Sequence, residues 1–171
     1  MQNKPSKNQR TSLLDRQKRI YGFLHRNHVG VLATVDPNHE PHGSVIYYVI
    51  DEQFTVSFLT KTSTKKYDNL INNDHSVLVV FESTSQTVAQ VIGKATEIRD
   101  VDDINDIAAA VFENSLKGRK PGIPPVAKLP DGEFVAFRIV PDQIKLATYS
   151  HPDGGNTQEI FESIESFTLK D

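Results

Sequence analysis

Hydroxyl and ammonium side chains are concentrated in one short segment, Thr60-Lys61-Thr62-Ser63-Thr64-Lys65-Lys66. The segment lies between an expected strand and an expected helix, where the first N–H groups of the helix have no acceptor within it. Hydroxyls, ammonium groups and free N–H groups together suit a phosphate or another anion. All of these groups occur within seven residues.

Lys65 and Lys66 would stand in the first turn of this helix, where the helix dipole disfavours each exposed cation by about 0.3–1 kcal/mol. A bound phosphate would reverse that effect. The same residues also fit an ordinary capped helix with two solvent-exposed lysines. The segment alone leaves both interpretations open.

The histidines suggest a second possible chemistry, a metal site. His25 and His28 are separated by two residues, and so are His39 and His42. Neither pair has a carboxylate cluster beside it and the chain has no cysteine, so a full ligand set is missing and we predict no metal site. His42 could instead contact a substrate, or simply end a strand in solvent.

Composition limits the class of protein. The chain has 171 residues, 37% of them hydrophobic, and a formal net charge of −3. This balance does not favour nucleic acid as a partner, and no apolar run is long enough for a membrane-spanning helix. We therefore expect a cytoplasmic protein with a frayed tail over residues 1–11 and a single domain over residues 12–171.

The first half of the chain predicts a helix followed by three antiparallel strands. Apolar residues recur at helical spacing from Ser12 to about Asn27, and alternation with a period of two then begins at Val29. The expected strands, separated by turns at Asp36–His39 and Asp51–Glu52, cover 29–35, 44–50 and 54–58.

The second half predicts a short helix capped by Thr64, strands over 76–81 and 87–98 with a bulge or corner at Gly93, and a helix over 101–116. An irregular loop over 117–132, a strand over 134–149 bent at Pro141 and a final segment over 159–169 follow. Few helices and five or six antiparallel strands indicate a mainly β protein with a closed or partly closed barrel.

Four sequence segments resemble one known family: Gly30-Val31-Leu32-Ala33-Thr34-Val35-Asp36; Pro41-His42-Gly43-Ser44; Phe58-Leu59-Thr60 with Lys65-Lys66 and Asn69-Leu70; and Val91-Ile92-Gly93-Lys94-Ala95. In this order, from Gly30 to Ile98, the sequence is similar to the flavin-binding split-barrel family related to pyridoxamine 5′-phosphate oxidase. The resemblance implies a six-stranded antiparallel split β-barrel with flanking helices. It also implies a homodimer that binds flavin mononucleotide (FMN) between its subunits.

The resemblance assigns cofactor contacts residue by residue. The FMN phosphate would be bound by Thr60, Ser63, Thr64, Lys65 and Lys66. The isoalloxazine ring would lie along the second strand, against the backbone of Ser44, Val45, Ile46 and Tyr47. Gln90 is a further cofactor contact to be considered, because a glutamine near this position contacts the flavin in the oxidase branch.

Two departures argue against oxidation of vitamin B6. The second strand has no basic residue, and residues 161–171 contain neither arginine nor histidine. The sequence therefore predicts an FMN-dependent oxidoreductase of unknown substrate. The alternatives are a non-catalytic protein of the same fold that binds or senses flavin or haem, and a barrel without cofactor that serves as a dimeric interaction module.

Overall fold

The protein is a ring of antiparallel strands with helices packed around it. The computed structural model describes residues 7–116, 122–149 and 161–168. In chain order the elements are α1 (Lys7–Arg26), β1 (Val29–Val35), β2 (Pro41–Ile50), β3 (Val56–Lys61), α2 (Lys65–Asn72), β4 (His75–Glu82), β5 (Thr87–Ile98), α3 (Val101–Leu116), the 3-10 helix η1 (Pro125–Lys128), β6 (Phe134–Tyr149) and β7 (Phe161–Thr168).

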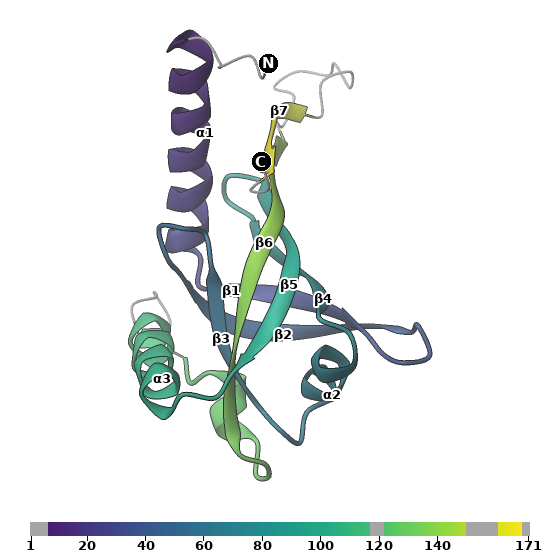
Figure 1. Ribbon diagram of the computed structural model, residues 1–171. Coiled ribbons are helices and arrows are strands. Elements are labelled where there is room, and N and C mark those ends of the chain that lie inside the picture. The colour runs from purple at the N-terminus through teal and green to yellow at the C-terminus, as the bar shows by residue number, and fades with distance from the viewer. Residues whose placement is uncertain (1–6, 117–121, 150–160, 169–171) are drawn as a thin grey trace.

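The strands close into a six-stranded barrel, as the sequence predicts. The order along the sheet is β3-β2-β1-β4-β5-β6, and β3 pairs back onto β6 to complete the ring. All pairs are antiparallel, and β7 extends the sheet from the free part of β6. Figure 1 shows α2 and α3 on either side of one end of the barrel, with α1 and β7 extending from the other end.

Two hydrophobic clusters stabilise this arrangement. The larger fills the barrel and includes the α1 face formed by Ile20, Phe23 and Leu24, which is at most 5% exposed. The smaller lies between the outer surface of the barrel and α3, where Val111 packs against Leu59 of β3. Helix α3 therefore covers the part of the barrel in which β2 and β3 are neighbours.

The structure corrects two predicted boundaries. Helix α1 begins at Lys7, ahead of the predicted start at Ser12, so the part of the expected tail from residue 7 onward is helical. Phe54 precedes β3 and has a φ of 66°, which belongs to the turn after β2. Residues 1–6 of the expected tail lie outside the described residues.

The predicted irregularity at Gly93 is confirmed. The β5–β6 register shifts between Ile92 and Gly93, and a Cβ on Gly93 would overlap the backbone of Val140 and Pro141. The close approach of two backbones explains why glycine is needed there.

Among the described residues, no helix has the length and apolar character that crossing a membrane requires.

Candidate functional site

The barrel is split between β2 and β3. Their ladder includes Tyr48 with Phe58 and stops there, although β2 extends back to Pro41 and β3 extends on to Lys61. Strand β3 stays paired with β6 along its whole length, whereas β2 stays paired with β1. The two strands therefore separate, and β2 has one open edge before Tyr48.

Backbone groups of β2 point into this split. The Tyr48 N–H donates to the His28 carbonyl on the β1 side at 3.0 Å. Because backbone groups of successive residues alternate between the two edges of a strand, those of Val45 and Tyr47 face the split. Val45 and Tyr47 have no ladder partner in β3, so the Val45 groups and the Tyr47 N–H are available to a ligand.

A cavity of about 270 Å³ occupies the split. One side is formed by β2, β3 and α2, and the other by α3 and the loop around η1. The lining residues are Ser44, Val45, Ile46, Tyr47 and Leu59, then Lys66, and on the opposite side Val111, Pro124, Pro125, Val126 and Leu129. The structure thus brings all four predicted β2 contacts together with Lys66.

Adjacent tyrosines of β2 have different surroundings, as their alternation predicts. Tyr48 is buried in the barrel, and its hydroxyl donates to the Leu24 carbonyl at 2.9 Å, which connects α1 to β2. This burial raises the pKa of Tyr48. Tyr47 points outward and lines the cavity.

The polar end of the cavity is formed by Lys66. Its Nζ donates to the Thr60 hydroxyl at 3.4 Å, a long contact with a neutral group. No carboxylate among the described residues pairs with this half-buried ammonium, and burial lowers the pKa of Lys66. The site therefore has a cation without a counter-anion.

Thr60 and Thr64 form a hydrogen-bonded chain beside Lys66. The Thr64 hydroxyl donates to the Lys61 carbonyl at 2.8 Å, so the Thr60 hydroxyl is the donor in its 2.9 Å contact with Thr64. This direction leaves the Thr60 oxygen to accept from Lys66. Thr64 also accepts from the Tyr67 N–H, which confirms it as the N-cap of α2.

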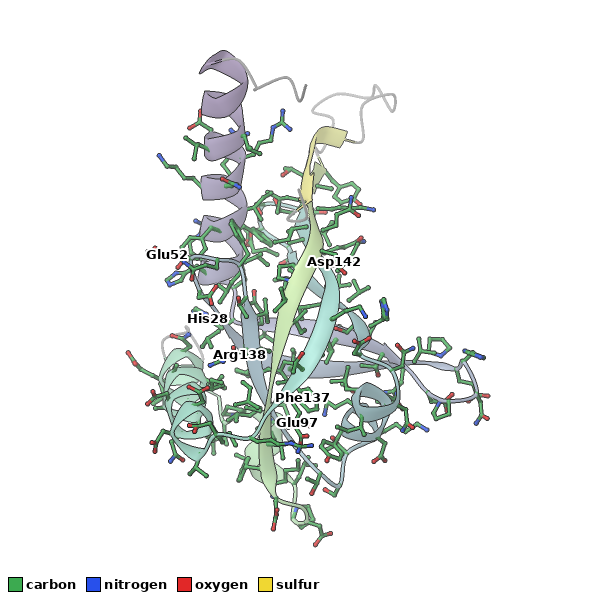
Figure 2. The ribbon with its side chains drawn as sticks, in the orientation of Figure 1. His28, Glu52, Glu97, Phe137, Arg138 and Asp142 are labelled. Carbon is green, nitrogen blue, oxygen red and sulfur yellow. The ribbon has the colours of Figure 1, made fainter. Side chains whose placement is uncertain are left out.

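Helix α2 is fixed against the barrel by two side chains. The Tyr67 ring meets Phe137 edge-on with centroids 6.1 Å apart, and its hydroxyl lies 3.5 Å from a Glu97 oxygen. Figure 2 shows Glu97 and Phe137 together on β5 and β6, where they form a cross-strand pair. The buried Asn69 amide donates to the Thr34 hydroxyl at 2.9 Å. These contacts determine where Lys66 stands.

Two of the predicted anion contacts have other partners in the structure. Lys65 is half exposed and pairs with Asp36 at 3.1 Å. Hydrogen bonds from the N–H groups of Glu40 and Asn38, together with Lys65, lower the pKa of Asp36. The exposed Ser63 hydroxyl donates to the Asp131 carbonyl at 2.7 Å. Their side chains thus hold neighbouring loops, while Thr60, Thr64 and Lys66 form one group.

Gln90 lies away from the cavity of its own chain. It is on the outer surface of β5, since its neighbours Ala89 and Val91 are buried in the barrel. Along this surface it pairs with Val79 of β4, and β1 lies between β4 and the β2 residues of the cavity.

The described histidines form no metal centre. The rings of His25 and His28 are 6.4 Å apart, and His42 Nδ1 lies 3.3 Å from the Ser44 hydroxyl. Within the described ranges, no three histidine, aspartate or glutamate side chains come together as a metal site would need. His42 is next to a residue of the cavity, which makes it a neighbour of the site.

The cavity wall formed by α3 and the η1 loop was not specified by the sequence. Val111 has the spacing of an ordinary buried helix residue, so its pattern predicts packing alone. The sequence predicts an irregular loop over 117–132, yet nothing local indicates that Pro124, Pro125, Val126 and Leu129 face β2. Residues 117–121 of that loop lie outside the described residues.

A closed antiparallel ring that parts between β2 and β3 defines the split-barrel class. The family model described as pyridoxamine 5′-phosphate oxidase matches residues 17–148. The chain therefore belongs to the pyridoxamine 5′-phosphate oxidase family, which confirms the resemblance. No curated protein matches the chain.

Solved structures show the same fold at low sequence identity. A putative pyridoxamine 5′-phosphate oxidase from Listeria innocua is 21% identical over 75% of this chain and 94% of its own, with a TM-score of 0.58. A related FMN-binding protein from Nostoc punctiforme is 17% identical over 95% and 96%, with a TM-score of 0.50. A haem-binding protein from Mycobacterium smegmatis is 14% identical over 98% and 60%, with a TM-score of 0.63.

Proposed function

We propose that the protein binds FMN in the split between β2 and β3, with the phosphate at Lys66. The observation that carries this proposal is the half-buried Lys66 ammonium, which has no counter-anion among the described residues and stands at the end of a cavity. The backbone N–H groups of Lys65 and Lys66, in the first turn of α2, also have no acceptor among these residues. A phosphate would satisfy all three donors.

The rest of the cavity suits a flat ring with polar edges. The open edge of β2 offers the N–H and C=O groups of Val45 and the N–H of Tyr47 to the ring edge. Pro124, Val126 and Leu129 supply an apolar surface on the other side, which would exclude water from the ring. This combination of apolar walls and a few directed polar groups is typical of cofactor sites.

A flavin bound here would supply hydride or electron transfer, while the chain binds and orients it. We therefore propose an FMN-dependent oxidoreductase whose substrate is unknown; its cytoplasmic location stays a prediction. The family membership and the FMN-binding Nostoc punctiforme protein of the same fold support the cofactor assignment. Haem fits less well, because the lining residues include no histidine, cysteine or methionine, and Tyr47 is the one lining residue of a type that ligates haem iron.

We also propose that the protein is a homodimer, with the cavity beside the subunit interface. The outer surface of β1, β2 and β4 exposes Val29, Val31, Val45 and Phe81, each more than 40% exposed. A continuous apolar surface of this kind favours association between chains. Gln90 lies on the same outer surface, so a cofactor contact from Gln90 would depend on this dimer.

The absorption spectrum of the purified protein, before and after addition of FMN, tests the cofactor. Flavin bands, with micromolar or tighter binding of added FMN, would support the proposal. A Soret band with no affinity for FMN would support haem instead, and a colourless protein that ignores both would refute either cofactor. Reduction of the bound flavin by NADH or NADPH, followed by turnover with an electron acceptor, would distinguish an enzyme from a flavin-storage protein.

A further inference from the structure

The turn that follows β3 has two functional sides. Lys66 lines the cavity and contacts Thr60. Lys61, Thr62 and Ser63 instead contact the loop that forms the opposite wall of the cavity. One short segment therefore connects the anion end of the cavity with the wall that would cover the ring.

Lys61 makes the central contact of this connection. It is the last residue of β3, and only 7% of it is exposed. Its Nζ donates to the Leu129 carbonyl at 2.6 Å and lies 4.9 Å from the centroid of the Phe134 ring. No carboxylate pairs with this ammonium in the described part of the chain, so its interactions with Leu129 and Phe134 replace those with water.

Thr62 and Ser63 add backbone contacts on the same side. The Thr62 N–H donates to the Glu133 carbonyl, and the Glu133 N–H donates to the Thr62 hydroxyl, both at 3.1 Å. Gly132 has a φ of +86°, and a Cβ on it would lie 2.6 Å from the Ser63 hydroxyl oxygen and 2.8 Å from the Ser63 nitrogen. The turn and the loop are thus too close for any residue but glycine.

Leu129 connects Lys61 with the cavity. Leu129 accepts from Lys61 through its carbonyl and also lines the cavity with Pro124, Pro125 and Val126. At the other end of the described loop, the Gly122 N–H donates to the Ser115 carbonyl of α3 at 3.2 Å. The wall is therefore anchored near α3 and at Lys61.

We propose that Lys61 is a positioning residue for the cofactor: it holds the 122–133 loop over the ring-binding part of the cavity and does not touch the phosphate. This inference rests on the proposed function. It assigns different tasks to the buried Lys61 and the half-buried Lys66, with Lys66 binding the phosphate and Lys61 fixing the wall. Riboflavin, which has the ring without the phosphate, separates the two tasks.

The test compares the affinities of Lys61→Met and Lys66→Met for FMN and for riboflavin, measured by flavin fluorescence. Lys61→Met should weaken both ligands by a similar factor of roughly ten, since it removes a hydrogen bond from a charged donor. Lys66→Met should weaken FMN alone. Lys61→Arg keeps a cationic donor and should restore most of the affinity, and Lys94→Met, at an exposed surface pair, should bind both ligands as the wild type does.

Hydrogen exchange in the flavin-free protein gives a second, independent readout. Amides of residues 124–133 should exchange faster in Lys61→Met than in the wild type. Unchanged affinity for both flavins, or a loss confined to FMN, would overturn the role of Lys61. If the wild type binds no flavin, the proposed function fails, and exchange of the loop still decides whether Lys61 holds it. If Lys61→Met does not fold, Gly132→Ala and Ser63→Ala disrupt neighbouring contacts between the same turn and loop and should weaken both flavins.

Discussion

Replacing Lys66 by methionine tests the phosphate site most sharply among single substitutions. The ammonium is half buried and its one contact, with Thr60, is 3.4 Å long, so a phosphate would meet a cation that is poorly solvated. A hydrogen bond to a charged group contributes about 1.5–3 kcal/mol, which corresponds to roughly 10–150-fold in Kd. We expect FMN affinity to fall by that factor in Lys66→Met.

Lys65 provides the matched comparison on the same helix. Its side chain is 52% exposed and paired with Asp36, so its replacement removes a surface ion pair of about 0–1 kcal/mol. Lys65→Met should therefore weaken FMN by less than about fivefold. Titration calorimetry or fluorescence would measure both variants, and equal losses in the two would refute the distinction that the structure draws.

The ligand-free protein should respond to Lys66 in the opposite sense. Burial lowers the pKa of Lys66 from 10.5, so the folded state disfavours the charged form. The buried charge therefore lowers the free energy of unfolding below the lowered pKa. That loss shrinks as the pH rises from the lowered pKa toward 10.5, because in this range the unfolded chain binds more protons than the folded chain. Lys66→Met should thus keep or raise the thermal midpoint without FMN, and FMN affinity of the wild type should fall over the same rise in pH. A large drop in the midpoint would mean that Lys66 has a structural role.

Four further substitutions test contacts in and around the barrel. The lowered pKa of Asp36 means that its carboxylate stabilises the fold near neutral pH and that this stabilisation is lost as the pH falls through that pKa. Asp36→Asn should therefore lower the thermal midpoint near neutral pH and flatten the loss of stability below pH 3.8. Acid titration followed by circular dichroism measures both effects. Gly93→Ala should cost about 1–3 kcal/mol in urea unfolding, since its Cβ would overlap the Val140 backbone. Gly43→Ala, whose Cβ would meet only a side chain at 3.4 Å, should be tolerated. Val31→Asp, at a side chain 44% exposed on the outer surface, should give a monomer in sedimentation velocity, and an unchanged dimer would move the interface elsewhere.

Local patterns in the sequence predict most of the elements but less of the site. Alternation and capping locate β1, α2 and α3 well, because the signals lie within each element, as with Thr64 at the start of α2. The ion pair between Lys65 and Asp36 joins residues far apart in sequence, and nothing beside Lys65 predicts it. The same holds for Lys61 and Leu129, which meet only because β3 pairs with β6.

The family resemblance supplied what local patterns lacked at the cavity. It assigned the flavin ring to Ser44, Val45, Ile46 and Tyr47. In the structure these residues lie in the part of β2 before Tyr48, where the ladder with β3 ends. The apolar wall stayed unpredicted because Val111 and Leu129 carry no signal of the surface they face.

The most direct test of the central claim is a crystal structure of the protein grown with FMN. The account predicts the phosphate within hydrogen-bond distance of Lys66 Nζ and of the first N–H groups of α2. It also predicts the ring in the β2–β3 split, with its edge on the backbone of Val45 and Tyr47. An FMN bound at another place, or a phosphate that leaves Lys66 without an anion, would contradict the account.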